Sequence, residues 1–297
     1  MNIWENIKLT FKQGGGEIKL IYVNIAVFLL YHIVLIVFRL FEVPATFLIS
    51  YLAVPADLTR LLYRFWTLIT YMFLHEGFFH LFFNMLCLYW FGKIFLSVYS
   101  ERHLIGLYLV GGLLAAFFYV GAYNIFPYYV NQLPNSVLLG ASGSIMALIV
   151  ASATKLPDMQ IRLFLLGSVK LKYVAIVTVL ISFFGITSAN GGGELAHLGG
   201  ALAGYLFVVL LNQGKDITSW VNKVIDWFVN LLRPRENMKV HKTKKNAPNR
   251  KMTDAEYNMN KARNMAEIDR ILDKIKKSGY DSLSAEEKRR LFEQGKK

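Results

Sequence analysis

Long, nearly uncharged apolar runs constrain this sequence more than any other feature. Runs of about 20 residues, enough to cross a bilayer, begin near six positions: Ile18, Phe78, Leu104, Ser142, Tyr173 and Leu195. Within hydrocarbon every backbone hydrogen bond must be made inside the protein, and continuous runs of this length suit helices rather than the alternating strands of a barrel. We therefore predict an all-α fold, a polytopic membrane bundle of about six transmembrane helices with a small soluble helical tail.

The composition supports a membrane protein. The 297 residues are 55% hydrophobic and only 18% charged, which is too apolar for a soluble globular domain of this size. Most of the formal net charge of +13 lies in the tail after Gln213. A basic segment next to a membrane span is typical of attraction to anionic lipid, so membrane lipid is a predicted partner and nucleic acid is not.

Charge between the apolar runs predicts the topology. Lysines and arginines precede the first run and lie between the second and third and between the fourth and fifth, whereas residues 125–140 carry no charge. Basic flanks belong on the cytoplasmic side. We predict a multi-pass protein of the cell (cytoplasmic) membrane with both termini in the cytoplasm, which places the starts of the second, fourth and sixth spans toward the outer face.

Four parts follow along the chain. Residues 1–17 are predicted to be a cytoplasmic segment, and residues 18–213 the membrane domain. Residues 214–252 hold an amphipathic surface helix, indicated by apolar residues at three-four spacing, followed by a basic linker. Residues 253–297 are predicted to form a cytoplasmic helical hairpin, because Ser278-Gly279 ends one helix and Ser284 with Glu287 forms a capping box for the next.

Polar groups inside membrane spans are costly, so each is a candidate functional group. They gather near the starts of three spans, at the same predicted depth: His75, His80 and Asn84; Gly140-Ala141-Ser142-Gly143-Ser144; and His197, followed by Gly200 and Gly204. A serine, an asparagine and histidines brought together from three helices are what a nucleophile, a base and an oxyanion site require.

Ser142 is the predicted nucleophile because small residues surround it at a turn that enters a helix. His197 is the predicted general base, which removes the serine proton and returns it to the leaving amine. Glu76 and Glu194 lie only at the edges of the motifs, so a Ser–His dyad without an acidic member is the simpler interpretation.

His80 and Asn84 are four residues apart on one helix face, and both can direct donors at the tetrahedral oxyanion beside the Ser142 N–H. His75 is either a supporting residue or a packing histidine.

The glycines have a structural interpretation that also serves chemistry. Gly200 and Gly204 form a small-xxx-small pattern that allows the sixth helix to approach the fourth, which His197 needs in order to reach Ser142. Gly140 and Gly143 are predicted supporting residues on the serine side. Taken alone, a serine followed by Gly143 is more often a helix contact than a nucleophile.

No metal or organic cofactor is predicted. His75 and His80 are five residues apart, about 140° around a helix, so they do not match the four-residue spacing of zinc proteases. The single cysteine, Cys87, lies in an apolar run without a cysteine partner.

The three motifs, in this order on spans two, four and six, resemble those of the rhomboid protease family. The resemblance covers about residues 18–213 and is closest to the compact six-helix bacterial type. It implies a Ser142–His197 catalytic dyad, an oxyanion hole that includes His80 and Asn84, and substrates that are transmembrane segments of other proteins. It also implies that residues 42–65 form a membrane-embedded loop beside the substrate gate.

Thr67 and Leu96 depart from the family pattern, in which an arginine and a glutamate are common at these positions.

Two other functions compete with a protease. A silent rhomboid-like scaffold or chaperone would bind membrane clients, although such relatives typically lack Ser142 or His197. A transporter would need polar groups that continue to the cytoplasmic side, whereas residues 145–150 and 206–211 are apolar. The client, the cleavage site and the oligomeric state are not encoded in these motifs.

Overall fold

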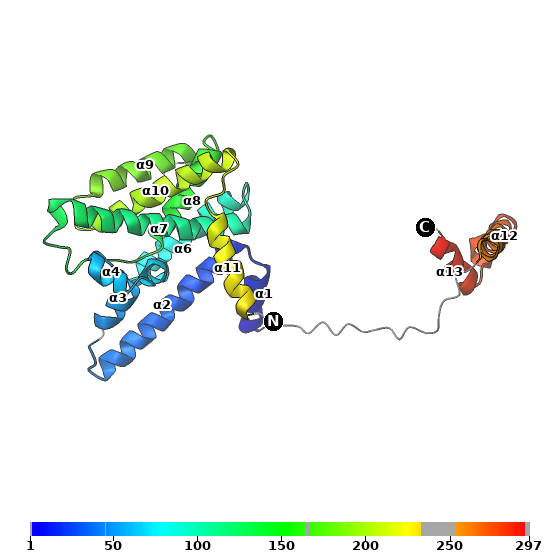
Figure 1. Ribbon diagram of the computed structural model, residues 1–297, viewed down its shortest axis with the longest axis horizontal. Helices are drawn as coiled ribbons and strands as arrows, with labels where there is room; N and C mark the ends of the chain where they lie inside the picture. Colours follow the sequence, from blue (N-terminus) through cyan, green and yellow to red (C-terminus); the bar gives the residue numbers. More distant parts are fainter. Residues whose placement is uncertain (1, 45, 164–166, 233–252, 295–297) are drawn as a thin grey trace. The chain divides into compact units, whose positions relative to one another are not determined.

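The computed structural model describes residues 2–44, 46–163, 167–232 and 253–294. The chain forms two compact units, Met1–Arg233 and Pro234–Lys297, and each is described by itself. The first unit contains all of the long apolar helices (Figure 1).

Six apolar helices lie where the sequence predicts them, which confirms the helical membrane bundle. Four are long and apolar enough to cross a membrane: α2 (Gly16–Leu40), α6 (Phe78–Leu96), α7 (Glu101–Ile125) and α10 (Gly191–Asn212). Two are shorter, α8 (Ser142–Lys155) and α9 (Leu171–Gly185). Helix α8 has 14 residues, so it extends only about 21 Å, less than the hydrocarbon thickness of about 30 Å.

Helix α8 is central, and it contacts α6, α7, α9 and α10 (Figure 1). Small residues allow this close packing. A Cβ added at Gly200 would lie 2.0 Å from the Gly143 carbonyl oxygen, and one at Gly204 would lie 2.2 Å from the carbonyl oxygen of Ala147. Backbone therefore packs directly on backbone between α10 and α8, as the small-xxx-small pattern predicts.

Short elements fill the connection between α2 and α6. Their bounds are α3 (Thr46–Leu52), β1 (Val54–Pro55), α4 (Leu58–Tyr63), α5 (Thr67–Thr70) and the 3₁₀ turn η1 (Tyr71–Phe73). Strand β1 pairs antiparallel with β2 (Val137–Leu138), which lies just before α8. This pairing, which the sequence did not indicate, joins the loop to the segment that leads into Ser142.

Arg64 and Trp66 anchor this loop. The Arg64 guanidinium donates to the Ser50 carbonyl oxygen at 2.7 Å and lies over the ring of Tyr51, with 4.3 Å between the guanidinium carbon and the ring centroid. The Trp66 indole donates to the Tyr51 carbonyl oxygen at 2.8 Å. The buried hydroxyl of Thr67 donates to the Arg64 carbonyl oxygen at 2.6 Å. Arg64 therefore holds the loop, although the position where the family commonly has an arginine is occupied by Thr67 in this chain.

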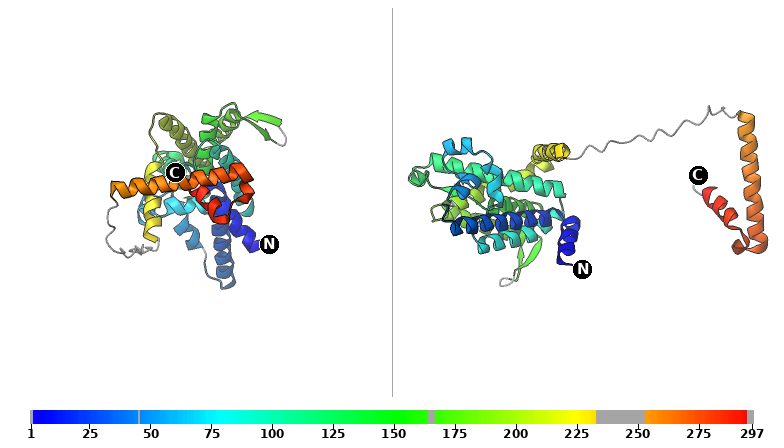
Figure 2. Two further views of the ribbon diagram at one scale, coloured as in Figure 1. Left: turned by 90° about the vertical axis from the view of Figure 1, so that its right-hand side faces the viewer. Right: turned by 90° about the horizontal axis from the view of Figure 1, so that it is seen from below.

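The remaining elements of this unit are peripheral. Helix α1 (Ile3–Gln13) precedes α2, and the 3₁₀ turn η2 (Pro127–Tyr129) follows α7. Strands β3 (Gln160–Leu163) and β4 (Gly167–Lys170) form an antiparallel hairpin that projects from the helices between α8 and α9 (Figure 2). The all-helical prediction did not include these two short strand pairs.

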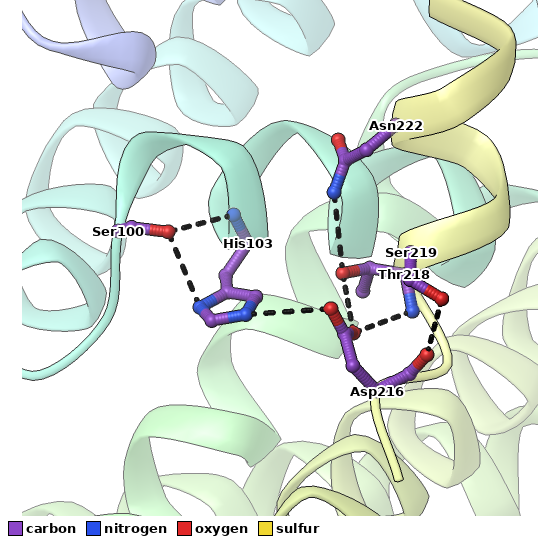
Figure 3. Close-up of polar contacts among 6 residues, drawn as sticks. All are labelled: Ser100, His103, Asp216, Thr218, Ser219 and Asn222. Atoms are coloured by element: carbon purple, nitrogen blue, oxygen red, sulfur yellow. Dashed lines mark hydrogen bonds and ion pairs between the residues drawn. The ribbon is translucent and has the colours of Figure 1, made fainter.

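Asp216 holds the chain just before helix α11 (Ser219–Leu232). Asp216 Oδ1 accepts from the N–H and the hydroxyl of Thr218, at 2.8 and 2.6 Å. Its other oxygen lies 3.5 Å from Nε2 of His103 in the first turn of α7, as Figure 3 shows. Thr218 also packs on Gly106, where an added Cβ would lie 2.6 Å from the threonine Cβ. One face of α11 is thus held against α7, and its opposite face exposes apolar side chains: Trp220, Val224, Trp227, Phe228 and Leu231.

In the second unit the described residues 253–294 form a helical hairpin. It contains α12 (Asp254–Ser278), the 3₁₀ turn η3 (Tyr280–Ser282) and α13 (Ala285–Gln294). Gly279 has a φ of +76°, which favours glycine where α12 ends. The predicted capping box forms, since the Ser284 N–H donates to Glu287 at 2.7 Å and the Glu287 N–H donates to the Ser284 hydroxyl at 3.3 Å. Ile271 and Leu283 are buried between the helices.

Candidate active site

The four residues predicted to carry the chemistry line one cavity of about 580 Å³ in the first unit. Ser142 comes from α8, His197 from α10, and His80 and Asn84 from α6. The polar residues from three spans therefore meet at one place, as their shared depth in the sequence predicts.

Ser142 is the first residue of α8, and the backbone before it is held in place. Gly140 has a φ of +117°, a conformation that residues with a side chain rarely adopt, and its N–H donates to the Tyr71 carbonyl oxygen at 2.9 Å. A Cβ at this position would lie 2.9 Å from the His80 ring. Gly140 thus turns the chain into α8 while leaving space for the His80 imidazole.

His197 lies in the second turn of α10, next to the closest helix contact. An added Cβ at Gly143 would lie 2.6 Å from Ala115 and 3.4 Å from the carbonyl oxygen of Ala196. The residues that directly follow Ser142 and precede His197 are therefore in contact. Gly143 and Gly200 set the separation of the predicted nucleophile and base.

His80 and Asn84 lie one turn apart on α6, with Asn84 buried and His80 partly exposed in the cavity. One N–H of the Asn84 amide donates to the His80 carbonyl oxygen at 2.8 Å. An amide nitrogen carries two hydrogens, so one donor remains for another acceptor. The N–H groups of Ser142 and Gly143 lie in the first turn of α8, where the helix itself offers no acceptor, so they add backbone donors.

His75 lies behind His80 and is fully buried. The two rings meet edge to face, with 5.0 Å between their centroids. Burial, together with the nearby His80, lowers the pKa of His75 to about 4, so its ring is uncharged near neutral pH. The contact packs a buried ring that does not line the cavity against one that does.

The sequence interpretation left one contact out. Glu194 Oε2 lies 3.2 Å from Nδ1 of His197, and the buried hydroxyl of Ser182 on α9 lies 3.1 Å from the same nitrogen. The three-residue spacing of Glu194 and His197 on a helix was a usable signal. Nothing in the sequence pointed to Ser182, because its helix precedes α10 and only packing brings it to His197.

Part of the cavity lining was also missed. It includes two tyrosines of α7 and three residues of the segment before β2: Tyr119, Tyr123, Gln132, Asn135 and Ser136. These side chains add hydroxyl and amide groups to the lining that α6, α8 and α10 contribute. Among the described residues, no group of three histidine, cysteine or acidic side chains is placed to hold a metal ion.

These features define a class of protein: a polytopic helical membrane protein with a serine, two histidines and an asparagine converging on a cavity among its spans. A model of the rhomboid domain matches residues 63–214, which is more than half of the chain and includes α6 to α10. The chain belongs to the rhomboid family.

One relative is presenilin-associated rhomboid-like protein A, mitochondrial, from Danio rerio. It is 30% identical over 173 residues, which are 56% of this chain and 43% of the relative. The chain therefore spans less than half of that relative's length. Residues 251–297, which include the helical hairpin, match a family of unknown function, DUF6576.

Proposed function

We propose that this protein is an intramembrane serine endopeptidase that cleaves transmembrane segments of membrane proteins. The observation that carries the proposal is the convergence of Ser142, His197, His80 and Asn84 on one cavity. Membership of the rhomboid family, which generally comprises intramembrane serine proteases, supports the same reaction.

In the proposed mechanism the Ser142 hydroxyl attacks the scissile carbonyl while Nε2 of His197 takes its proton. The tetrahedral oxyanion is stabilised by the Ser142 backbone N–H, the free amide hydrogen of Asn84 and the His80 ring, close to the positive end of the α8 dipole. His197 then protonates the leaving amine, and water hydrolyses the acyl-enzyme by the reverse set of proton transfers.

The short length of α8 supports cleavage below the membrane surface. If its C-terminal end lies at the cytoplasmic interface, about 21 Å of helix places Ser142 within the outer part of the hydrocarbon layer. The polar wall of the cavity provides a path for water to this depth. The charge distribution supports cytoplasmic termini in the cell membrane, with the active site toward the outer face.

Substrate access is proposed beside the loop of residues 42–65. The β1–β2 pairing joins this loop to the chain just before Ser142, and Ile49 of α3 lines the cavity. The proposed substrates are transmembrane helices that unwind easily near the outer surface, for example at Gly or Pro.

Cleavage of a single-span reporter in liposomes tests the reaction, together with labelling by a fluorophosphonate probe. We expect wild type to cleave and label, and Ser142→Ala and His197→Ala to lose at least about 10⁴-fold in kcat. Ser144→Ala is the matched control, because this hydroxyl is buried two residues away and does not line the cavity. Absence of cleavage and labelling in wild type would instead favour a scaffold that binds membrane clients.

Protease protection tests the orientation. In sealed inside-out vesicles, an epitope after residue 297 should be digested, whereas in right-side-out vesicles it should be protected. The reverse pattern would contradict cytoplasmic termini without affecting the proposed chemistry.

A further inference from the structure

A carboxylate lies against the proposed base on the side away from the reaction. Glu194 in the first turn of α10 places Oε2 3.2 Å from Nδ1 of His197, one turn further along the helix. Ser182 on α9 approaches the same nitrogen at 3.1 Å. The imidazole therefore has polar partners from two helices at Nδ1, and His197 lines the cavity.

These partners select one tautomer of His197. An ionised carboxylate only accepts hydrogen bonds, so Nδ1 must carry the proton and Nε2 must carry the lone pair that a general base needs. The position of Glu194 in the first turn of a helix favours its ionised form, because the N-terminal end of the dipole is positive. Only about one-sixth of the carboxylate-bearing side chain is exposed, at 17%, so water competes weakly for this contact.

Packing fixes the carboxylate. Its stem crosses the end of α9 at Gly185, where an added Cβ would lie 2.9 Å from Glu194 Cγ and 3.2 Å from Cδ. Gly185 is helical, so alanine there introduces no backbone strain and only removes this space. The absence of a side chain at one position of α9 thus lets Glu194 reach back to His197.

We propose that Glu194 is a positioning residue for His197, assisted by Ser182, and that the site works as a Ser–His–Glu arrangement rather than as a bare dyad. Glu194 holds the imidazole in the Nδ1–H tautomer and stabilises the imidazolium that forms when Ser142 attacks. The inference rests on the proposed protease function. Other titratable groups that face His197 in the cavity are Glu76, His80, Tyr119 and Tyr123, and none of them contacts Nδ1 within the described residues.

The kinetic test measures kcat and KM of the full-length protein in liposomes from pH 5 to pH 9. Glu194→Gln keeps the shape and an acceptor oxygen but removes the charge, and Glu194→Leu removes both. We expect kcat to fall at least about 10-fold in Glu194→Gln and further in Glu194→Leu, with KM unchanged. The acid limb of the kcat/KM profile should move to lower pH, because loss of a neighbouring negative charge disfavours the protonated imidazole. Glu194→Asp should recover part of the activity.

Gly185→Ala is the matched variant that leaves every polar group in place. Its added methyl displaces the Glu194 stem, so we expect a smaller loss of kcat in the same direction. In the double variant with Glu194→Leu it should add no further loss, because both changes break the same contact. If the losses of kcat from Gly185→Ala and Glu194→Leu instead add up in the double variant, Gly185→Ala acts through a general packing effect.

A spectroscopic measurement separates this inference from the protease function. In ¹⁵N-histidine-labelled Ser142→Ala protein, the Nδ1–H resonance of His197, assigned with His197→Asn, should shift or vanish when Glu194→Leu is added. The positioning role of Glu194 would be overturned if its replacement changed neither the His197 resonance, nor kcat, nor the acid limb of the kcat/KM profile. The Ser142 chemistry would then remain intact. If wild type neither cleaves nor labels but the resonance responds, the contact stands and the proposed protease function fails.

Discussion

Helices α10 and α2 are both apolar enough to cross a membrane, but they are buried to very different extents. Half of the most apolar 18-residue window of α10 is buried inside the protein, compared with 6% of that of α2. Helix α10 presents glycine and alanine to α7 and α8, with Gly199, Gly200 and Gly204 all in backbone contact. Much of α2 instead exposes large aliphatic side chains, among them Leu30, Ile33 and Ile36.

The difference shows which helices carry the site. In a bilayer, apolar side chains gain little by leaving lipid for protein, so close association depends on small residues that let backbones pack. The helix rich in small residues carries His197, and the lipid-facing helix supplies no residue to the cavity. Four predictions, from the largest expected effect to the smallest, test this division.

Replacement of Gly200 should have the largest effect. In Gly200→Ala the new Cβ would lie 2.0 Å from the Gly143 carbonyl oxygen, so α10 and α8 must separate. We expect a loss of about 3 kcal/mol or more in the free energy of unfolding, with loss of activity. Thermal unfolding in detergent measures the first and reporter cleavage the second. Gly121→Ala on α7, where no neighbour lies within 4 Å, should leave both unchanged.

Replacement of Gly140 should affect activity more than stability. Alanine at a φ of +117° is strained, and its Cβ would lie 2.9 Å from the His80 ring. We expect a loss of about 1–3 kcal/mol in stability, and a fall in kcat of at least about 10-fold through displacement of His80. Gly214→Ala, which has a positive φ but no neighbour within 4 Å, controls for strain alone. Equal activity losses in the two variants would contradict the role of the His80 contact.

The buried imidazole of His75 should make stability depend on pH. Its pKa is about 4 in the folded protein and near 6.5 in an unfolded chain, so it favours folding above pH 6.5. This contribution is lost as the pH falls toward 4, and it amounts to about 2 kcal/mol between pH 7.5 and pH 5. Thermal unfolding of wild type and His75→Gln across this range measures the difference in slope. Parallel curves for the two proteins would show that His75 does not titrate in this way.

Substitutions on the exposed face of α2 should have the smallest effect. Ile33 and Ile36 are more than half exposed, at 57% and 58%, and neither borders the cavity. Ile33→Val and Ile36→Val should change the free energy of unfolding by less than about 0.5 kcal/mol and leave kcat unchanged. A clear loss of activity in either variant would mean that this face of α2 takes part in substrate binding.

Much of the architecture could be predicted because it depends on local patterns. The apolar runs located the helices within a few residues, and Gly279 and the Ser284–Glu287 capping box marked the hairpin of the tail. The spacing of Gly200 and Gly204 indicated the α10–α8 contact. The runs did not reveal the lengths of the helices, because α8 and α9 are shorter than the other four. The start of α8 follows Gly140, whose N–H bonds to Tyr71, and the β1–β2 pairing, both of which are contacts between distant segments, and the local β3–β4 hairpin separates α8 from α9.

The sequence by itself determined that this is a helical membrane protein and indicated which polar residues belong to its candidate site, because uncharged runs, glycine spacing and polar residues in spans are local properties. Its motifs gave a resemblance to the rhomboid family, which the match of the rhomboid domain to residues 63–214 then showed. Only the tertiary structure decided that Arg64 anchors the loop, that tyrosines of α7 line the cavity, and that Glu194 and Ser182 meet Nδ1 of His197. These contacts depend on how helices rotate and cross, and on the space left by one glycine, which no spacing along a single helix encodes.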